Sequence, residues 1–255
     1  MWARRNRESK TSNAEQAPGT TGGRPTASAR ALAQVIERSS RVQGPAVEAY
    51  VSRLRHANPG AGPADIVAKL EKRYVAVVTA SGVAVGMAAT IPGIGTLSAL
   101  SAAAAETVAF LEATALFALA LAVVHGIPAD HRERRRALVL SVLVGDNSKR
   151  AVAELIGPGR TNGGWISEGV AALPLSSMSR LNSRLLKSWV KRYTVRRSAL
   201  LFGKLLPVGI GAVVGAVGNY LVGKRITRNA RHAFGAPPTR WPSTLRLLPP
   251  TREAG

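Results

Sequence analysis

Apolar runs and polar breaks alternate along the chain and divide it into helical segments. Apolar residues recur every three or four positions in residues 63–73 and 175–193, which is the period of a helix with one buried face. A break rich in proline and glycine at 91–95 separates two longer runs. The pattern predicts an all-α fold in which one helix begins near Pro63 and another is capped by Thr96.

The second half of the chain follows the same pattern. A turn at 127–130 leads into a helix over 131–144 that begins with arginines and ends with apolar residues. A glycine-rich loop at 157–164 precedes the basic amphipathic helix of 175–204. The last helix is predicted to end at Phe234.

Two tracts carry no charge and are long enough to suggest a membrane. Residues 74–91 and 205–223 each have about 18 or 19 residues, and a spanning helix needs roughly 17 to 25. Each tract contains a pair of small residues four positions apart, a spacing that lets helices pack closely. These predicted packing residues are Gly82, Gly86, Gly211 and Gly215. Gly223 ends its tract, so we expect it to contribute less.

The first tract and the helix that follows it predict a hydrophobic helical hairpin. The chain would turn at Pro92 and Gly93 and return to about residue 124. Basic residues flank both ends of this hairpin, so both ends should stay in the cytoplasm. The tract 205–223 is basic at both ends too, and it either spans once against the charge rule or embeds without crossing.

Glu106 and Glu112 are the only carboxylates of the hairpin, which has no lysine or arginine. They are six positions apart, so on a helix they point roughly 120° apart and cannot share one reacting centre. We predict that both are intramembrane polar groups or part of a solvated face, with a structural role. A basic partner is expected from another segment, such as 180–197.

The net charge of +21 favours a polyanionic partner, either nucleic acid or the anionic face of a membrane. Four basic residues form a stripe along the amphipathic helix, beside an apolar stripe that includes Met178 and Leu185. We predict that this stripe contacts anionic lipids of a membrane. Two alternatives stay open: binding to nucleic acid, and an ordinary helix that faces the core and leaves its cationic side in solvent. The stripe consists of Arg180, Arg184, Lys187 and Lys191.

The composition of the termini completes the predicted organisation. Residues 1–29 are predicted to be a disordered basic tail, without the apolar region of a signal peptide, that stays in the cytosol. Residues 30–62 form a short helical region, 63–238 the main helical domain, and 239–255 a proline-rich tail.

Catalytic and cofactor motifs are not found in the sequence. The glycines of 209–215 have neither a preceding strand nor the acidic residue of a dinucleotide site. No two histidines are spaced as metal ligands, and His125 is best explained as a partner of a helix C-terminus. There is no cysteine. We therefore predict no enzyme activity, no cofactor and no metal.

Several segments together resemble the EcsC protein family, particularly its actinobacterial members. The resemblance spans roughly 63–238 and implies membrane association and a link to an ABC transporter or to envelope physiology. It supplies no catalytic residues. The matching segments are 79–95 (TASGVAVGMAATIPGIG), 117–126 (FALALAVVHG), 134–145 (RRRALVLSVLVG), 206–219 (LPVGIGAVVGAVGN) and 230–235 (ARHAFG).

These observations predict a membrane-associated helical bundle with a hydrophobic hairpin, placed on the cytoplasmic membrane with most of the chain on the cytoplasmic side. The expected role is that of an accessory or scaffold protein, whose partners are anionic lipids and an ABC transporter or another membrane protein. Two other functions stay open. One is a soluble, basic, helical nucleic-acid-binding protein, and the other is a pore-forming protein with a sheltered hairpin.

Overall fold

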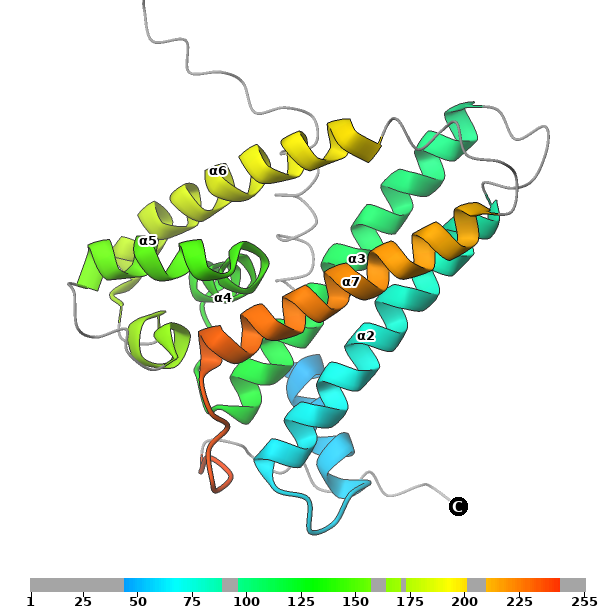
Figure 1. Cartoon of the computed structure of the whole chain (residues 1–255). Coiled ribbons are helices and arrows are strands. Elements are labelled where there is room, and N and C mark those ends of the chain that lie inside the picture. The colour runs from blue at the N-terminus through cyan, green and yellow to red at the C-terminus, as the bar shows by residue number, and fades with distance from the viewer. Residues whose placement is uncertain (1–43, 89–95, 157–163, 171–172, 201–209, 244–255) are drawn as a thin grey trace, which may run out of the picture.

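The structure is a computed structural model that describes residues 44–88, 96–156, 164–170, 173–200 and 210–243 (Figure 1). Every regular element in these ranges is a helix, which confirms the all-α prediction. The tail 1–29 and the proposed turn at Pro92 and Gly93 lie outside the described residues. The elements are a helix over 44–56, α2 (Pro63–Ala88), α3 (Thr96–Val124), α4 (Arg132–Val144), α5 (Asp146–Ile156), the π-helix η1 (Ile166–Val170), α6 (Leu175–Leu200) and α7 (Ile210–Phe234).

The helix boundaries follow local chemistry. Helix α2 begins at Pro63, and the Asp65 carboxylate in its first turn accepts a hydrogen bond of 2.9 Å from the Gly62 N–H. Helix α4 ends at Gly145, whose φ of 70° lies in the region that glycine tolerates best. The side chain of Asn229 lies against Gly145 and donates to the Val142 carbonyl, so α7 covers this corner.

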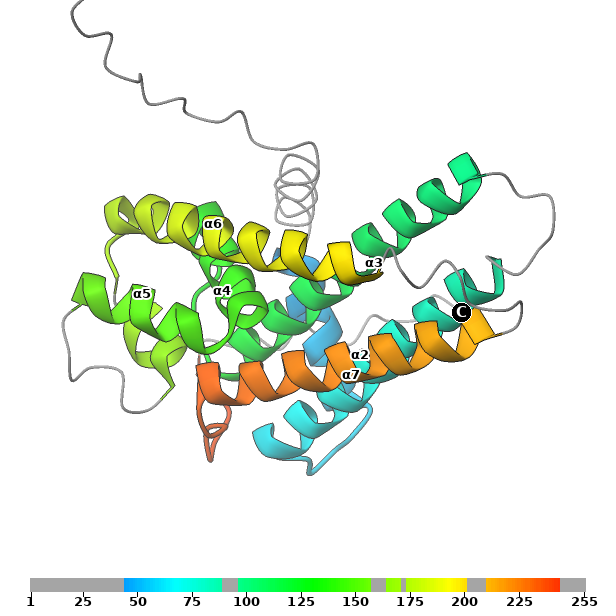
Figure 2. The same cartoon turned by 45° about the horizontal axis from the view of Figure 1, so that its top comes forward.

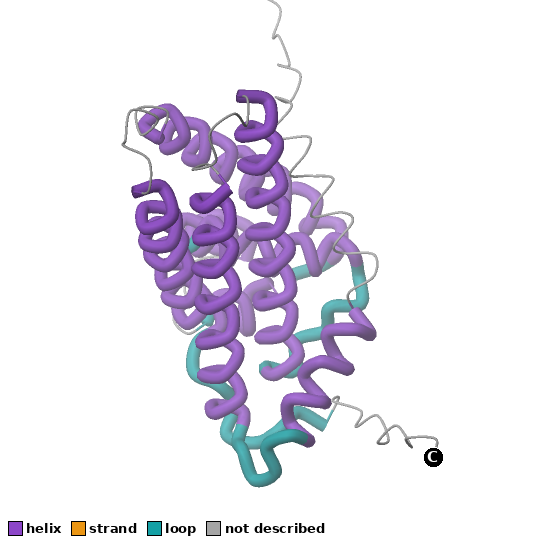
Figure 3. Tube along the Cα trace, turned by 90° about the vertical axis from the view of Figure 1, so that its right-hand side faces the viewer, coloured by secondary structure: helices purple, strands orange, loops and turns teal. Residues whose placement is uncertain are grey.

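The helices form two packed groups (Figures 1 and 3). Helix α7 lies beside α2, and α3 packs against α2 as well. Helix α4 lies at the centre of the second group, with α6, α5 and η1 around it. The same helix also contacts α3 and α7, so it joins the two groups.

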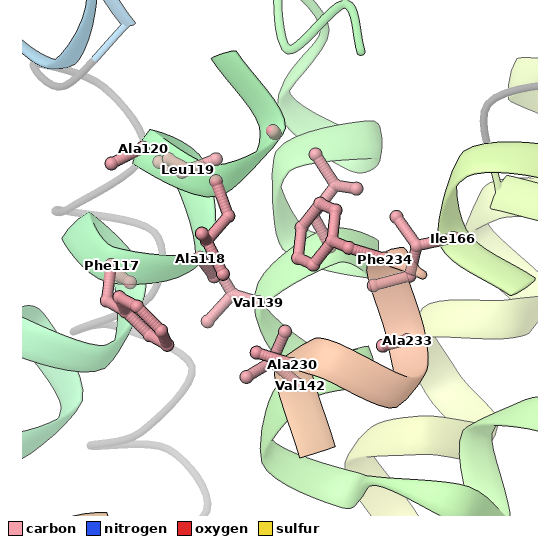
Figure 4. Packing of buried hydrophobic residues seen from close by; sticks show 14 of the residues in the cluster. Phe117, Ala118, Leu119, Ala120, Val139, Val142, Ile166, Ala230, Ala233 and Phe234 are labelled. Carbon is pink, nitrogen blue, oxygen red and sulfur yellow. The ribbon is translucent and has the colours of Figure 1, made fainter. Parts of the chain in front are cut away.

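The hydrophobic core surrounds the second half of α3. All of residues 117–124 except Val123 are buried there, and α4 and the end of α7 pack against them (Figure 4). Many of these residues are alanines, which lets neighbouring backbones come close. The ring of Tyr74 stacks on Phe117 with centroids 4.6 Å apart. The helix over 44–56 adds Val47, Val51 and Leu54 to the same core, so it packs with the main domain.

Helices α2 and α7 run antiparallel with a constant register. Glu71 meets Arg231 near the core, Val78 meets Gly223 further out, and Gly82 meets Gly215 and Asn219 further still. A Cβ on Gly82 would lie 2.5 Å from the Gly215 carbonyl oxygen, so only glycine fits there.

The environment of the other glycines corrects one expectation. Gly223 is buried, and a Cβ there would lie 2.8 Å from Cγ2 of Val78, so this position is a packing position as well. Gly218 faces open space. Gly86 and Gly211 lie within α2 and α7, but their surroundings are outside what the structure describes.

The first prediction concerns the glycine contact. Changing Gly82 to Ala should lower the free energy of unfolding by about 1–3 kcal/mol, because the added methyl group forces the helices apart. Changing Gly218 to Ala adds the same methyl group where nothing lies within 4 Å. That control should leave stability unchanged or raise it by up to about 1 kcal/mol. Urea unfolding followed by circular dichroism measures both, and equal stability of the two variants would contradict the close contact.

Candidate functional site

The outer halves of three helices form a surface without any lysine or arginine. They are residues 74–88 of α2, 96–116 of α3 and 210–223 of α7, and we call them the apolar arm. Figures 1 and 2 show these segments at the right, extending beyond α4 and α5. The basic residues just before the tract 74–91 and just after the tract 205–223 lie where the arm meets the core.

The arm exposes most of the large apolar side chains of the described surface. Of ten such exposed residues, eight lie on the arm. Val78 of α2, Leu111 of α3 and Gly223 of α7 are the last buried residues before the arm opens to solvent. Beyond them, toward the end of the arm, the described residues are exposed or partly exposed, with the exception of the buried Gly82. An exposed apolar surface of this extent is typical of a membrane or protein contact. The eight residues are Val77, Val108, Leu116, Val213, Val217, Tyr220, Leu221 and Val222.

Helix α3 divides between the arm and the core. Within the described residues one segment, Ala105–Val124, is long and apolar enough to cross a membrane, and 56% of it is buried inside the protein. The buried part is mainly 117–124, which the sequence analysis assigned to the membrane hairpin. Those side chains form the core around Phe117, so they cannot also contact lipid while the domain is folded. Among the described residues of α3, the part on the arm stays exposed and is available to a membrane.

A polar cluster ties the three helices of the arm together. The Asn219 amide of α7 donates to the Glu106 carboxylate of α3 at 2.7 Å and to the Val78 carbonyl of α2 at 2.9 Å, and it lies 3.5 Å from the Ser81 hydroxyl. The partner of Glu106 is therefore a neutral amide of α7, which differs from the basic partner predicted from the segment 180–197. Glu112 is partly buried on the same helix and is not part of this cluster.

Basic side chains converge at the base of the arm. Because α2 and α7 are antiparallel, the residues just before the first tract and just after the second lie at the same level. All five are exposed, and we call them the basic collar. In the sequence both groups are visible only as charge that flanks the apolar tracts, about 150 positions apart, and their proximity follows from the fold. The collar consists of Lys72 and Arg73 of α2 and Lys224, Arg225 and Arg228 of α7.

The predicted lipid-contact stripe lies on α6, in the other group of helices. The apolar face of α6 is already used, since Met178, Leu181 and Leu185 are buried in the core. Arg180, Arg184 and Lys187 are exposed, and the side chain of Lys191 is outside the described part. Arg184 pairs with Glu154 of α5 at 2.7 Å, which neutralises part of the stripe. The helix fits the alternative of a core-facing element with a solvated cationic side.

A cavity of about 1080 Å³ lies below the arm, between α2, α5, η1 and the end of α7. His125 lies in its wall. Its Nδ1 is 2.8 Å from the Leu121 carbonyl oxygen and therefore carries the proton, while Nε2 is buried without a hydrogen-bond partner. Burial lowers the pKa of His125, and the backbones of Leu121 and Gly235 offset part of this effect. His125 thus caps α3 as a neutral hydrogen-bonding group.

Metal chemistry has no support in the described ranges. No group of three or more histidine, aspartate or glutamate side chains lies close enough there to hold an ion.

Comparisons with protein-family models, with curated proteins and with solved structures found no match to this chain. The resemblance to the EcsC family therefore stays a prediction.

The second prediction concerns the Asn219 cluster. Changing Glu106 to Gln keeps the oxygen that accepts the Asn219 hydrogen bond, so the melting temperature should change little. Changing Asn219 to Asp places a second carboxylate against Glu106 and the Val78 carbonyl, and should cost about 1–3 kcal/mol. The double variant restores a donor, from Gln at 106, and should regain most of that loss. A double variant no more stable than the Asn219 variant would contradict the contact.

The third prediction concerns the pH dependence of stability. The unfolded chain protonates His125 near its ordinary pKa of 6.5, but the folded protein resists protonation because the ring is buried. The free energy of unfolding should therefore fall as the pH drops below 6.5. Changing His125 to Gln should remove this contribution, whereas changing the exposed His131 to Gln should not. Urea unfolding between about pH 7.5 and about pH 5.5 measures the slopes, and identical slopes would contradict the assignment.

Proposed function

We propose that this protein is a non-enzymatic accessory or scaffold protein that docks on the cytoplasmic face of a membrane by embedding the apolar arm. The observation that carries this proposal is the exposed apolar surface of the arm, which ends at the basic collar. Apolar side chains enter the hydrocarbon layer, and cations beside them meet anionic lipid headgroups.

The charge pattern of the arm favours embedding over spanning. The apolar segments have basic residues at both ends, and basic flanks tend to stay on the cytoplasmic side. The described part of α2 on the arm, residues 74–88, reaches about 22 Å, which is enough to enter one leaflet of a hydrocarbon core about 30 Å thick. Embedding from one side satisfies the charge rule, including for the tract 205–223.

The interior of the arm suits a low-dielectric environment. The Glu106 carboxylate accepts a hydrogen bond from Asn219, and the Asn219 amide also satisfies the Val78 carbonyl. Polar groups within a membrane are tolerated when they face other helices and are paired in this way. The helices α4, α5 and α6 stay in water and offer a surface to a partner, for which the EcsC resemblance suggests a transporter.

The fourth prediction tests docking. Changing Leu221 to Glu places a charge on the exposed face of the arm, where the leucine side chain is 60% exposed. Losing a leucine contact of about 1.5–3 kcal/mol and adding a charge should reduce binding to neutral phosphatidylcholine vesicles at least tenfold in flotation assays. Changing Leu175 to Glu is the matched control, because that leucine is also exposed but lies on α6.

The outcome distinguishes docking through the arm from nonspecific hydrophobic binding. Normal flotation of the Leu221 variant, or equal loss in the Leu175 variant, would contradict the proposal. In cells, the wild-type protein should pellet with membranes and be released by detergent but not by salt. Recovery in the soluble fraction under all conditions would also count against docking.

A further inference from the structure

A groove between α2 and α7 opens at the base of the arm. Its volume is about 560 Å³. The groove contains two members of the basic collar from α7 and one from α2, with an aromatic ring at its upper end. It is lined by Ala68, Glu71, Lys72 and Val75 of α2 and by Tyr220, Lys224, Thr227, Arg228 and Arg231 of α7.

The groove has an uncompensated positive charge. Its one carboxylate, Glu71, is held by Arg231 through two hydrogen bonds of 2.7 and 2.5 Å. The hydrogen bonds to Glu71 and the charge of Glu71 raise the pKa of Arg231, and Glu71 compensates the charge of Arg231.

Three cations are left over once that pair is formed. Lys72, Lys224 and Arg228 have no carboxylate partner among the interactions of the described residues. The Lys224 ammonium lies 5.7 Å from the centroid of the Tyr220 ring, a contact that holds the lysine without neutralising it. Cations gathered in one groove repel one another, and an anion bound among them relieves that repulsion. Phosphate is one of the anions that lysine and arginine bind well.

The surface of α7 beside the groove indicates which kind of molecule supplies the phosphate. Val217, Leu221, Lys224 and Arg228 follow one another at spacings of three or four, so they form one stripe along α7. The first two are exposed apolar residues of the arm, and the last two line the groove. A ligand that fills this stripe has a phosphate at one end and hydrocarbon at the other.

We infer that the groove between α2 and α7 binds the phosphate group of an anionic phospholipid, whose acyl chains lie along the Val217–Leu221 face of the arm. The inference rests on the proposed docking and makes it specific, because it assigns headgroup recognition to three residues of the basic collar. The cationic stripe of α6 then has no part in headgroup binding.

The experiment compares two triple variants of the full chain. In the groove variant, Lys72, Lys224 and Arg228 are changed to Gln. In the control variant, Arg150, Arg180 and Lys187 are changed to Gln, which removes the same charge from exposed positions on α5 and α6. Binding to vesicles of phosphatidylcholine with a minor fraction of phosphatidylglycerol should fall about 100-fold in the groove variant, at about fivefold per basic residue. The control variant should lose much less.

Equal losses in the two variants would show diffuse attraction and overturn the groove. Neutral phosphatidylcholine vesicles should bind the wild type and the groove variant alike, since the arm is intact in both. A wild type that binds neither kind of vesicle would overturn the docking itself.

A soluble probe separates the two proposals. The wild type should bind dihexanoyl-phosphatidylglycerol in a titration, and the groove variant should not. If the wild type binds this soluble lipid but does not bind vesicles, the groove is supported and the membrane docking is contradicted. Inorganic phosphate should bind far more weakly than the short-chain lipid. Equal binding of the two ligands, lost in the groove variant, would overturn the assignment to a lipid.

Discussion

Helices α2 and α7 come from distant parts of the chain, and at Gly82 they approach so closely that a single methyl group would overlap the carbonyl oxygen of Gly215. This contact sets the spacing of the arm, since the buried core ends before it. It brings Asn219 within reach of both α2 and α3. It also places the basic ends of two apolar tracts at one level. The shape of the arm and the charge at its base therefore follow from one helix pair.

The structure resolves a conflict between hydropathy and packing in α3. Its most hydrophobic stretch, by sequence, includes both the exposed residues near Val108 and the buried residues near Phe117. Hydropathy measures how unfavourably water solvates a segment. A segment of high hydropathy can be buried in a protein core or in a lipid bilayer, so hydropathy does not distinguish the two. The packing neighbours of each half of α3 make that distinction. The inner half has α4 and α7 around it, and the outer half has few neighbours.

The sequence predicts local features well. The helix starts at Pro63 and Thr96 and the helix end at Phe234 agree with the structure, because they depend on residues within one turn. The short helix α5 is not predicted from the sequence, although Ala151, Val152 and Leu155 lie on its core-facing side, because it has only 11 residues and follows α4 after the single residue Gly145. The π-helix η1 has no sequence signature of its own.

Features that depend on partners were less predictable. The sequence predicts a structural role for Glu106, but nothing near it in the sequence points to its hydrogen-bond partner Asn219, which lies 113 positions away. The apolar face of α6 looks the same whether it meets a membrane or α4. The sequence predicts the basic collar only if the two apolar tracts are assumed to pack antiparallel. The charges that flank the tracts are compatible with this packing but do not require it.

One more consequence follows from the three levels at which α7 meets α2. An α-helix turns about 100° per residue, so adding or removing one residue between Asn219 and Arg231 rotates the outer half of α7 relative to the inner half by that angle. If Arg231 kept its hold on Glu71, Asn219 would then face away from Glu106 and a bulkier side chain would replace the glycines against α2. The length of this part of α7 is thus constrained together with its residues, because one inserted or deleted residue would separate Asn219 from Glu106.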